Sequence, residues 1–301
     1  MSENFPKQPE EKPAEPEKEK PESGMLAEGE RVDSFVKLVE TSLRLSFKEI
    51  IVNGTENLEL IPPNRRVIFA PTHLSDSDVP LTISAVGKRF HVAVGDASTH
   101  HKFSENTPAW LANQITGPEN FYPIKHQKDE KGVERGSFNP EDFETMQKPL
   151  EERKAMILAA YFKGGHGWEL PSKGGYGAVY LAEIANALIV PVAVNIKSKE
   201  QVGMGGGGAL KTLLKRPNAE VNIGKPLDLP KIEGMERMAE ILKKKKTTKL
   251  STEEVQEFHR LSKALREHSD TLMEHLANLL PKEKQGPWKA EDERKTDKDM
   301  L

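Results

Sequence analysis

The stretch that decides the fold reads Arg66-Val-Ile-Phe-Ala-Pro-Thr-His-Leu-Ser-Asp-Ser-Asp78-Val-Pro-Leu81. Its first residues form an apolar run that predicts a buried strand, and Pro71 ends that run. A helix is expected to begin at Val79, because a proline is tolerated in the first turn of a helix. His73 and Asp78 therefore lie in a loop at the carboxyl end of a strand, where open α/β sheets place their ligands.

His73 and Asp78 are a candidate acid–base pair. A neutral imidazole can take a proton from a hydroxyl, and a nearby carboxylate can orient the imidazole and stabilise the imidazolium. The alternative is structural: Ser75, Asp76 or Asp78 caps the following helix, and His73 is an ordinary loop histidine. The pair alone leaves both interpretations open, because short motifs often match by chance.

The rest of the chain alternates apolar strand-like runs with amphipathic helical runs. This alternation predicts an α/β fold with a central, mostly parallel sheet flanked by helices, followed by a helical extension. Strands are expected at 49–53, 66–70, 90–95, 156–162, 188–195 and 219–223. Helices are expected at 30–48, 79–88, 98–117, 139–154, 176–186, 233–245 and 251–279, the last opened by the capping-box pattern Ser251-x-x-Glu254.

The two ends of the chain differ in composition from its body. Residues 1–24 hold seven Glu and four Lys, so this segment cannot bury a core and is expected to be a disordered tail. Residues 281–301 are similarly charged and are expected to be disordered as well. Between the tails we expect a main domain at 25–230 and a helical extension at 231–280. The first tail carries the whole net charge of −3 (4 − 7 = −3), so the balanced body predicts no nucleic-acid partner.

Several classes of site are excluded or disfavoured by composition. The chain has no cysteine, which excludes disulfides, thiolate nucleophiles and cysteine-bound metals. His100 and His101 are adjacent and have no evident third ligand, so no metal site is expected. The glycines from Gly203 to Gly208 lack the Lys and Ser or Thr of a phosphate-binding P-loop. No signal peptide or membrane-spanning run is found, so we expect a cytoplasmic protein, with peripheral attachment to the inner face of a membrane as an alternative.

The order of the segments resembles the glycerolipid acyltransferase superfamily, which acylates glycerol-3-phosphate and lysophosphatidic acid. The resemblance covers about residues 45–230. A strand ending at Asn53-Gly54 precedes His73 and Asp78, which match the first sequence block of the family. The helix from Gly174 to Ala185 matches part of the third block, and Val190-Pro-Val192 matches the fourth. Val221-Asn-Ile-Gly-Lys-Pro-Leu227 matches the strand and turn that close the domain.

The resemblance implies an O-acyltransferase. His73 would act as general base on an acceptor hydroxyl, and Asp78 would orient it. The hydroxyl would attack an acyl thioester carried by CoA or acyl carrier protein, which is a substrate; no further cofactor is implied. The acceptor would be a lysolipid or a molecule like glycerol phosphate.

Two blocks depart from the usual pattern of that family. The third block is usually Phe-Pro-Glu-Gly-Thr-Arg, whereas this chain has Phe162-Lys-Gly-Gly-His-Gly167, without the glutamate and the arginine. The second block usually ends in an arginine that binds the acceptor phosphate, whereas here a lysine or a histidine stands near that place. The candidates for substrate binding are therefore Lys125, His126, Lys163, Gly164, Gly165 and His166. An acceptor without a phosphate, a catalytically inactive lipid- or partner-binding protein, and an acyl ester or thioester hydrolase are the alternatives.

Two segments have both a structural and a membrane interpretation. The helix expected at 30–48 gathers Val36, Val39 and Leu43 on one face, which either packs against the sheet or lies on a bilayer. The basic run Lys243-Lys-Lys-Lys246 either is a solvated helix end or attracts an anionic membrane.

Overall fold

The computed structural model of the chain describes residues 28–75, 77–90, 92–96, 121–123, 127–128, 134–135, 140–153, 155–161, 168–198 and 214–289. Its strands are β1 Glu49–Asn53, β2 Arg66–Pro71, β3 Val92–Asp96, β4 Phe121–Pro123, β5 Gln127–Lys128, β6 Glu134–Arg135, β7 Ala155–Leu158, β8 Ala187–Lys197 and β9 Asn218–Ile223. Its helices are α1 Glu28–Ser46, α2 Asp78–Val86, α4 Pro140–Arg153, α5 Gly177–Ala185, α7 Glu236–Thr247 and α8 Thr252–Asn278, with 3-10 turns η1 Thr55–Leu60, η4 Lys282–Lys284 and η5 Gly286–Trp288.

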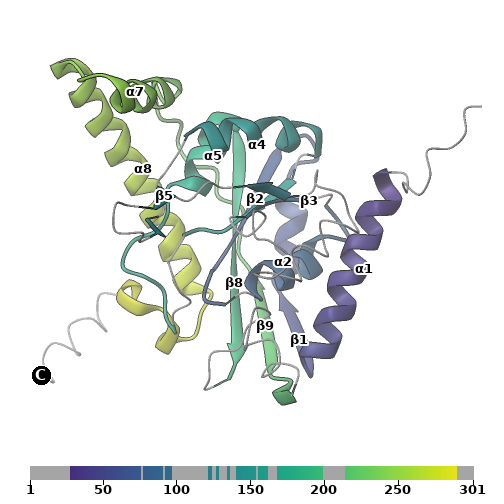
Figure 1. Ribbon diagram of the computed structural model, residues 1–301. Coiled ribbons are helices and arrows are strands. Elements are labelled where there is room, and N and C mark those ends of the chain that lie inside the picture. The colour runs from purple at the N-terminus through teal and green to yellow at the C-terminus, as the bar shows by residue number, and fades with distance from the viewer. Residues whose placement is uncertain are drawn as a thin grey trace, which may run out of the picture.

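A seven-stranded sheet in the order β1-β9-β8-β2-β7-β3-β4 forms the centre of the molecule (Figure 1). Neighbouring strands pair parallel except β8 and β9, which pair antiparallel. This arrangement confirms the predicted α/β class with a mostly parallel central sheet. Strands β5 and β6 form a separate, small antiparallel pair.

Strand β2 lies inside the sheet and is buried on both faces. Ile68 and Ala70 belong to a core cluster that α4, α5, α7 and α8 share. Val67 and Phe69 belong to a second cluster, which α1 and α2 cover. Alternate residues of a strand point to opposite faces, so this continuous apolar run is what a strand between two helical layers requires.

Helix α1 packs against α2, and this contact explains why one face of α1 is apolar. Val36 and Leu43 are buried, and Val39 packs at the margin of the same cluster. The packing interpretation of this helix is therefore confirmed for these residues. Among the described residues, no helix is both long enough and apolar enough to cross a membrane.

The C-terminal helices share the main core with the sheet. Leu261, Leu265 and Leu272 of α8 are fully buried in the same cluster as β2. The capping box predicted at the start of α8 is confirmed, since the side chains of Ser251 and Glu254 each accept a hydrogen bond from the other's backbone N–H.

The prediction of a disordered tail from residue 281 is wrong for residues 281–289. This segment forms η4 and η5, and its Lys284 and Gly286 are buried. Leu280 before it and Trp288 within it pack into the core, and the Trp288 indole Nε1 donates to Pro171 O at 2.7 Å. Two apolar anchors thus hold a segment whose average composition is that of a disordered chain.

Candidate active site

The loop that carries His73 and Asp78 begins after Pro71, where β2 ends beside the longer strand β8. Thr72 N donates to Val192 O at 2.9 Å, and Val194 N donates to Thr72 Oγ1 at 3.0 Å. Thr72 therefore occupies the edge of β8 that β2 leaves uncovered after Pro71. This contact fixes the start of the loop at the carboxyl end of the central strands.

The Asp78 carboxylate is buried, with 1% of the residue exposed, and it accepts hydrogen bonds from three residues of the loop. Its Oδ2 accepts from Thr72 Oγ1 and from Leu74 N, both at 2.8 Å, and its Oδ1 accepts from Ser75 Oγ at 2.7 Å. Two of these donors lie immediately before and after His73. Asp78 thus binds the residue on each side of the histidine, Thr72 through its hydroxyl and Leu74 through its backbone N–H. His73 itself is half-buried.

Helix capping explains only part of the hydrogen bonding in this loop. Ser77 is the N-cap of α2, and its side chain makes no capping hydrogen bond. Ser75 Oγ accepts from Ser77 N at 3.1 Å, so Ser75 does support the first turn. The Asp78 carboxylate, however, turns back into the loop around His73. Its place at the start of a helix is also favourable for a negative charge, because backbone N–H groups and the helix dipole point there.

Two side chains that the sequence did not single out lie close to this pair. Tyr161, just after β7, is 2% exposed, and its hydroxyl makes no hydrogen bond of ordinary geometry within the described ranges. Burial raises the pKa of the Tyr161 phenol, the charge of Asp78 raises it further, and the backbone of His73 opposes this. The phenol therefore keeps its proton and offers a neutral donor beside the pair.

Lys284 of η4 is the second such side chain. Its ammonium Nζ donates to Ile196 O at 3.0 Å, near the carboxyl end of β8. Burial lowers the pKa of Lys284, while the charges of Asp78 and Glu283 raise it. No signal in the sequence pointed to this lysine, since it stands in a segment of mixed charge. Tyr161 was also missed, because the strand expected at 156–162 includes it, whereas β7 ends at Leu158.

Helix α8 holds the end of the glycine-rich loop against β7. Gly175 N donates to Ala160 O at 2.9 Å, Ser269 Oγ donates to Gly175 O at 3.0 Å, and an Arg266 amine donates to Gly174 O at 2.9 Å. A Cβ on Gly174 would lie 2.3 Å from Ser269 Oγ, so only glycine permits this approach. The predicted binding residues Lys125, His126, Lys163, Gly164, Gly165 and His166 lie outside the described residues.

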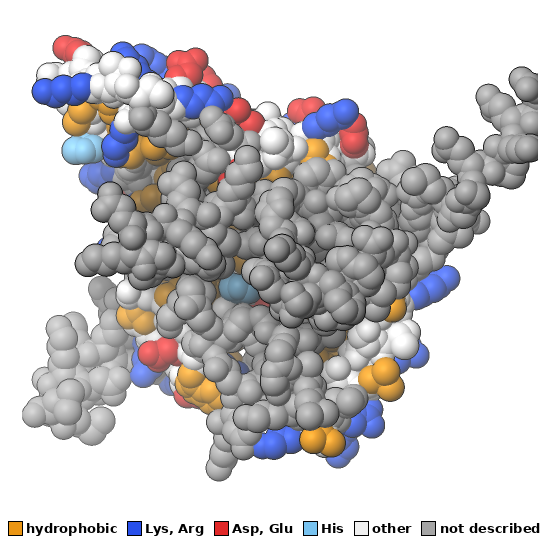
Figure 2. All heavy atoms as spheres, viewed as in Figure 1, with side chains coloured by type: hydrophobic (Ala, Val, Ile, Leu, Met, Phe, Trp, Pro, Cys, Tyr) orange, Lys and Arg blue, Asp and Glu red, His pale blue; other side chains and the backbone are white. Residues whose placement is uncertain are grey.

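The basic run at the end of α7 is largely engaged within the molecule. Lys243 pairs with Glu144 at 3.2 Å, Lys244 pairs with Glu254 at 2.6 Å, and the Lys245 ammonium lies 4.7 Å from the centre of the Phe258 ring. Figure 2 shows acidic and basic side chains interspersed over this helix. These contacts favour the solvated-helix interpretation, and membrane attachment through this run stays a prediction. No group of three or more potential metal ligands occurs in the part of the chain that the structure describes.

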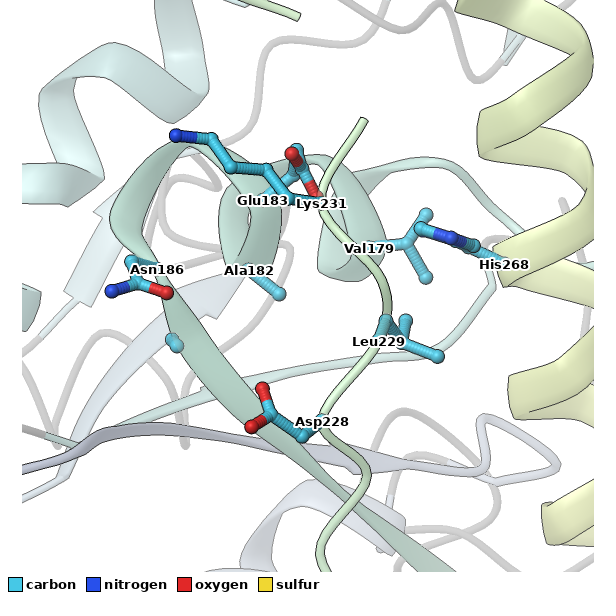
Figure 3. Close-up of a pocket in the computed structure, with 9 residues that line it drawn as sticks. Val179, Ala182, Glu183, Asn186, Asp228, Leu229, Lys231 and His268 are labelled. Carbon is cyan, nitrogen blue, oxygen red and sulfur yellow. The ribbon is translucent and has the colours of Figure 1, made fainter. Parts of the chain in front are cut away.

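A small pocket lies at the opposite end of the sheet, where α5 leads into β8 (Figure 3). Glu183, Lys231 and His268 are among the residues that line it. Ile232 N donates to Glu183 Oε1 at 2.7 Å, which ties the segment before α7 to α5. Burial raises the pKa of the Glu183 carboxyl, and the Ile232 bond and Lys231 only partly offset this effect.

Glu183→Gln is expected to stabilise the protein near neutral pH. Because the pKa of Glu183 in the folded protein lies above the ordinary value of a glutamate, folding favours its protonated form, and that contribution to stability is lost as the pH rises through the folded pKa. The neutral amide avoids the loss, so the variant should melt higher than wild type at pH 7 and equally near pH 4. The gain should be below about 1 kcal/mol, because solvent screens a partly exposed carboxylate. Calorimetry at both pH values measures it, with Glu240→Gln on the exposed face of α7 as control; a constant difference at both pH values would contradict the expectation.

Comparison with known proteins finds distant similarity to solved structures. No protein-family profile and no curated protein sequence match the chain. The chain is similar to the crystal structure of the 1-acyl-sn-glycerophosphate (LPA) acyltransferase PlsC from Thermotoga maritima, with a TM-score of 0.43 and 15% sequence identity over 73% of this chain and 80% of that chain. Any assignment of function therefore rests on the residues of the loop after β2 and on the order of the sequence motifs.

Proposed function

We propose that this protein is an O-acyltransferase that moves a fatty acyl group from an acyl thioester of CoA or acyl carrier protein to a hydroxyl of a glycerolipid, such as a lysophosphatidic-acid-like acceptor. The observation that carries the proposal is the loop after β2, in which a buried Asp78 carboxylate accepts hydrogen bonds from both neighbours of His73, the Thr72 hydroxyl and Leu74 N. The order of motifs in the sequence supports the choice of reaction.

In the proposed reaction His73 acts on the acceptor and Asp78 acts through His73. The imidazole takes the proton of the acceptor hydroxyl as its oxygen forms a bond to the thioester carbonyl carbon. The tetrahedral intermediate then breaks its carbon–sulfur bond, and the departing thiolate takes the proton back from the imidazolium. The negative charge of Asp78 stabilises that imidazolium, and proton transfer by such a base contributes about 10²–10⁴-fold to the rate.

Positioning must supply much of the remaining rate enhancement, because two substrates have to meet at one base. The hydrogen bonds from Thr72 and Leu74 to Asp78 leave the backbone around His73 little freedom. The additional bond between Thr72 and Val194 ties this loop to the sheet. The base is therefore preorganised before either substrate binds.

Release of free thiol from acyl thioesters tests the proposal directly. The chain has no cysteine, so a thiol-reactive dye reports only the thiol of CoA or of the carrier protein. Acyl-CoA and acyl-carrier-protein donors should be tested with lysophosphatidic acid, with glycerol 3-phosphate, with phosphate-free lysolipids and without acceptor. We expect release that depends on an acceptor, together with an esterified product.

Other outcomes identify other functions. Free fatty acid that forms at the same rate without an acceptor would identify a hydrolase. No thiol release from any donor, in protein shown by calorimetry to be folded, would identify a binding protein and reject the proposal.

A further inference from the structure

Lys284 is a buried positive charge, with 7% of the residue exposed. The negative charges of Asp78 and Glu283 raise its pKa, but among the described residues neither carboxylate forms a direct ion pair with its ammonium. Its ammonium donates to Ile196 O at 3.0 Å and lies 4.8 Å from the centre of the Trp168 ring. Lysines are almost never buried unless they are paired, because removing the charge from water is costly. An ammonium has three donors, and these contacts use one of them.

The edge of β8 places this ammonium beside the His73 loop. Backbone groups of Val192, Val194 and Ile196 point to the same side of the strand, because side-to-side alternation has a period of two residues. Thr72 forms hydrogen bonds with the backbone of Val192 and Val194, where β2 has ended, and the Lys284 ammonium donates to the next such group, Ile196 O. Two residues along a strand span about 6.6 Å, so Lys284 follows Thr72 at about that spacing along the edge.

We propose that Lys284 binds a phosphate group of a substrate at the His73 loop. The proposal rests on the proposed function, in which the acceptor or the CoA donor carries phosphate. A phosphate on a neighbouring carbon of glycerol lies a few bonds from the reacting hydroxyl. That geometry fits a cation one strand repeat beyond Thr72, whereas the reacting oxygen itself must contact His73.

Lys284 lies beneath a side chain that is itself partly at the surface of the molecule. The indole of Trp168 lies against the ammonium and is itself 49% exposed, so one aromatic ring separates the charge from solvent. Leu170 N donates to Lys284 O at 2.9 Å, which joins the end of the glycine-rich loop to η4. A phosphate held here would therefore lie close to Lys284, Trp168 and the edge of β8 at Ile196.

Binding measured by calorimetry, without turnover, tests the proposal. Wild type should bind glycerol 3-phosphate, lysophosphatidic acid or CoA, and Lys284→Gln should bind the same ligand about 10- to 100-fold more weakly, because a hydrogen bond to a charged group is lost. Glutamine keeps an N–H donor on a side chain one bond shorter than lysine, and a melting temperature equal to that of wild type would show that the structural role of Lys284 is retained in this variant. Lys284→Met removes both functions, and Lys282→Met removes a charge from the same turn as the matched control.

The ligand whose binding is weakened by Lys284→Gln identifies the substrate that carries the phosphate. Weaker binding of glycerol 3-phosphate and lysophosphatidic acid alone assigns the acceptor phosphate, and weaker binding of CoA alone assigns the donor. Monoacylglycerol, which has no phosphate, should bind wild type and Lys284→Gln equally.

The inference is overturned if wild type binds none of the phosphorylated ligands, if folded Lys284→Gln binds them as tightly as wild type, or if monoacylglycerol is weakened equally. Phosphate binding that depends on Lys284 in a protein without acyl transfer would reject the proposed function and leave this inference standing.

Discussion

Replacing His73 with alanine is expected to lower the rate of acyl transfer by about 10²–10⁴-fold, because the reaction loses its general base. The melting temperature should change little, since the hydrogen bonds that hold the loop come from the side chains of Thr72 and Ser75 and from Leu74 N, and all of these remain. Acceptor-dependent thiol release gives kcat/KM for both proteins, and calorimetry gives their melting temperatures.

The matched control for this substitution is His275→Ala, which removes an exposed histidine near the end of α8. That variant should keep the wild-type rate. A His73→Ala protein with an unchanged rate would show that another group takes the proton. The phenol of Tyr161 is not a candidate for that role, because burial and the charge of Asp78 raise its pKa and it keeps its own proton at neutral pH.

Much of the fold follows from local sequence patterns. The run in β2 is apolar at every position that the two core clusters use, which predicts a strand between two helical layers. The strand order could not be predicted in the same way. β1 pairs with β9, and the hydrogen bond between Asn53 and Asn222 joins side chains 169 residues apart. Pairing at that distance depends on the packing of the whole chain and leaves no periodic trace in the sequence.

In the candidate site, too, only the residues that lie close together in the sequence could be predicted. His73 and Asp78 could be predicted because they lie in one short loop and share a strand–helix junction. Lys284 could not, because its bond to Ile196 joins residues 88 apart and its own segment has the composition of a disordered tail. A few anchors, such as the Trp288 indole bonded to Pro171 O, decide the structure of that segment. Composition averages over such anchors and misses them.

Replacing Asp78 with alanine is expected to damage both the stability and the activity of the protein. The change leaves Thr72 Oγ1, Leu74 N and Ser75 Oγ without their acceptor in a buried place. Breaking a buried charged hydrogen-bond network typically costs about 3–5 kcal/mol, so the free energy of unfolding should fall by that order. Acyl transfer should fall by about 10²-fold or more, because His73 loses both its fixed backbone and the charge that stabilises its protonated form.

Asp78→Asn separates these two effects. The amide has the same shape and keeps one oxygen acceptor but no charge, so its loss of unfolding free energy should be smaller than that of alanine, while its loss of activity should remain large. Chemical denaturation and thiol release measure the two quantities in the same preparations. Asp270→Ala in α8 is the control and should shift stability by no more than about 0.5 kcal/mol. If Asp78→Asn is destabilised but transfers acyl groups at the wild-type rate, then Asp78 serves only to fold the loop, and the charge of the carboxylate has no part in the reaction.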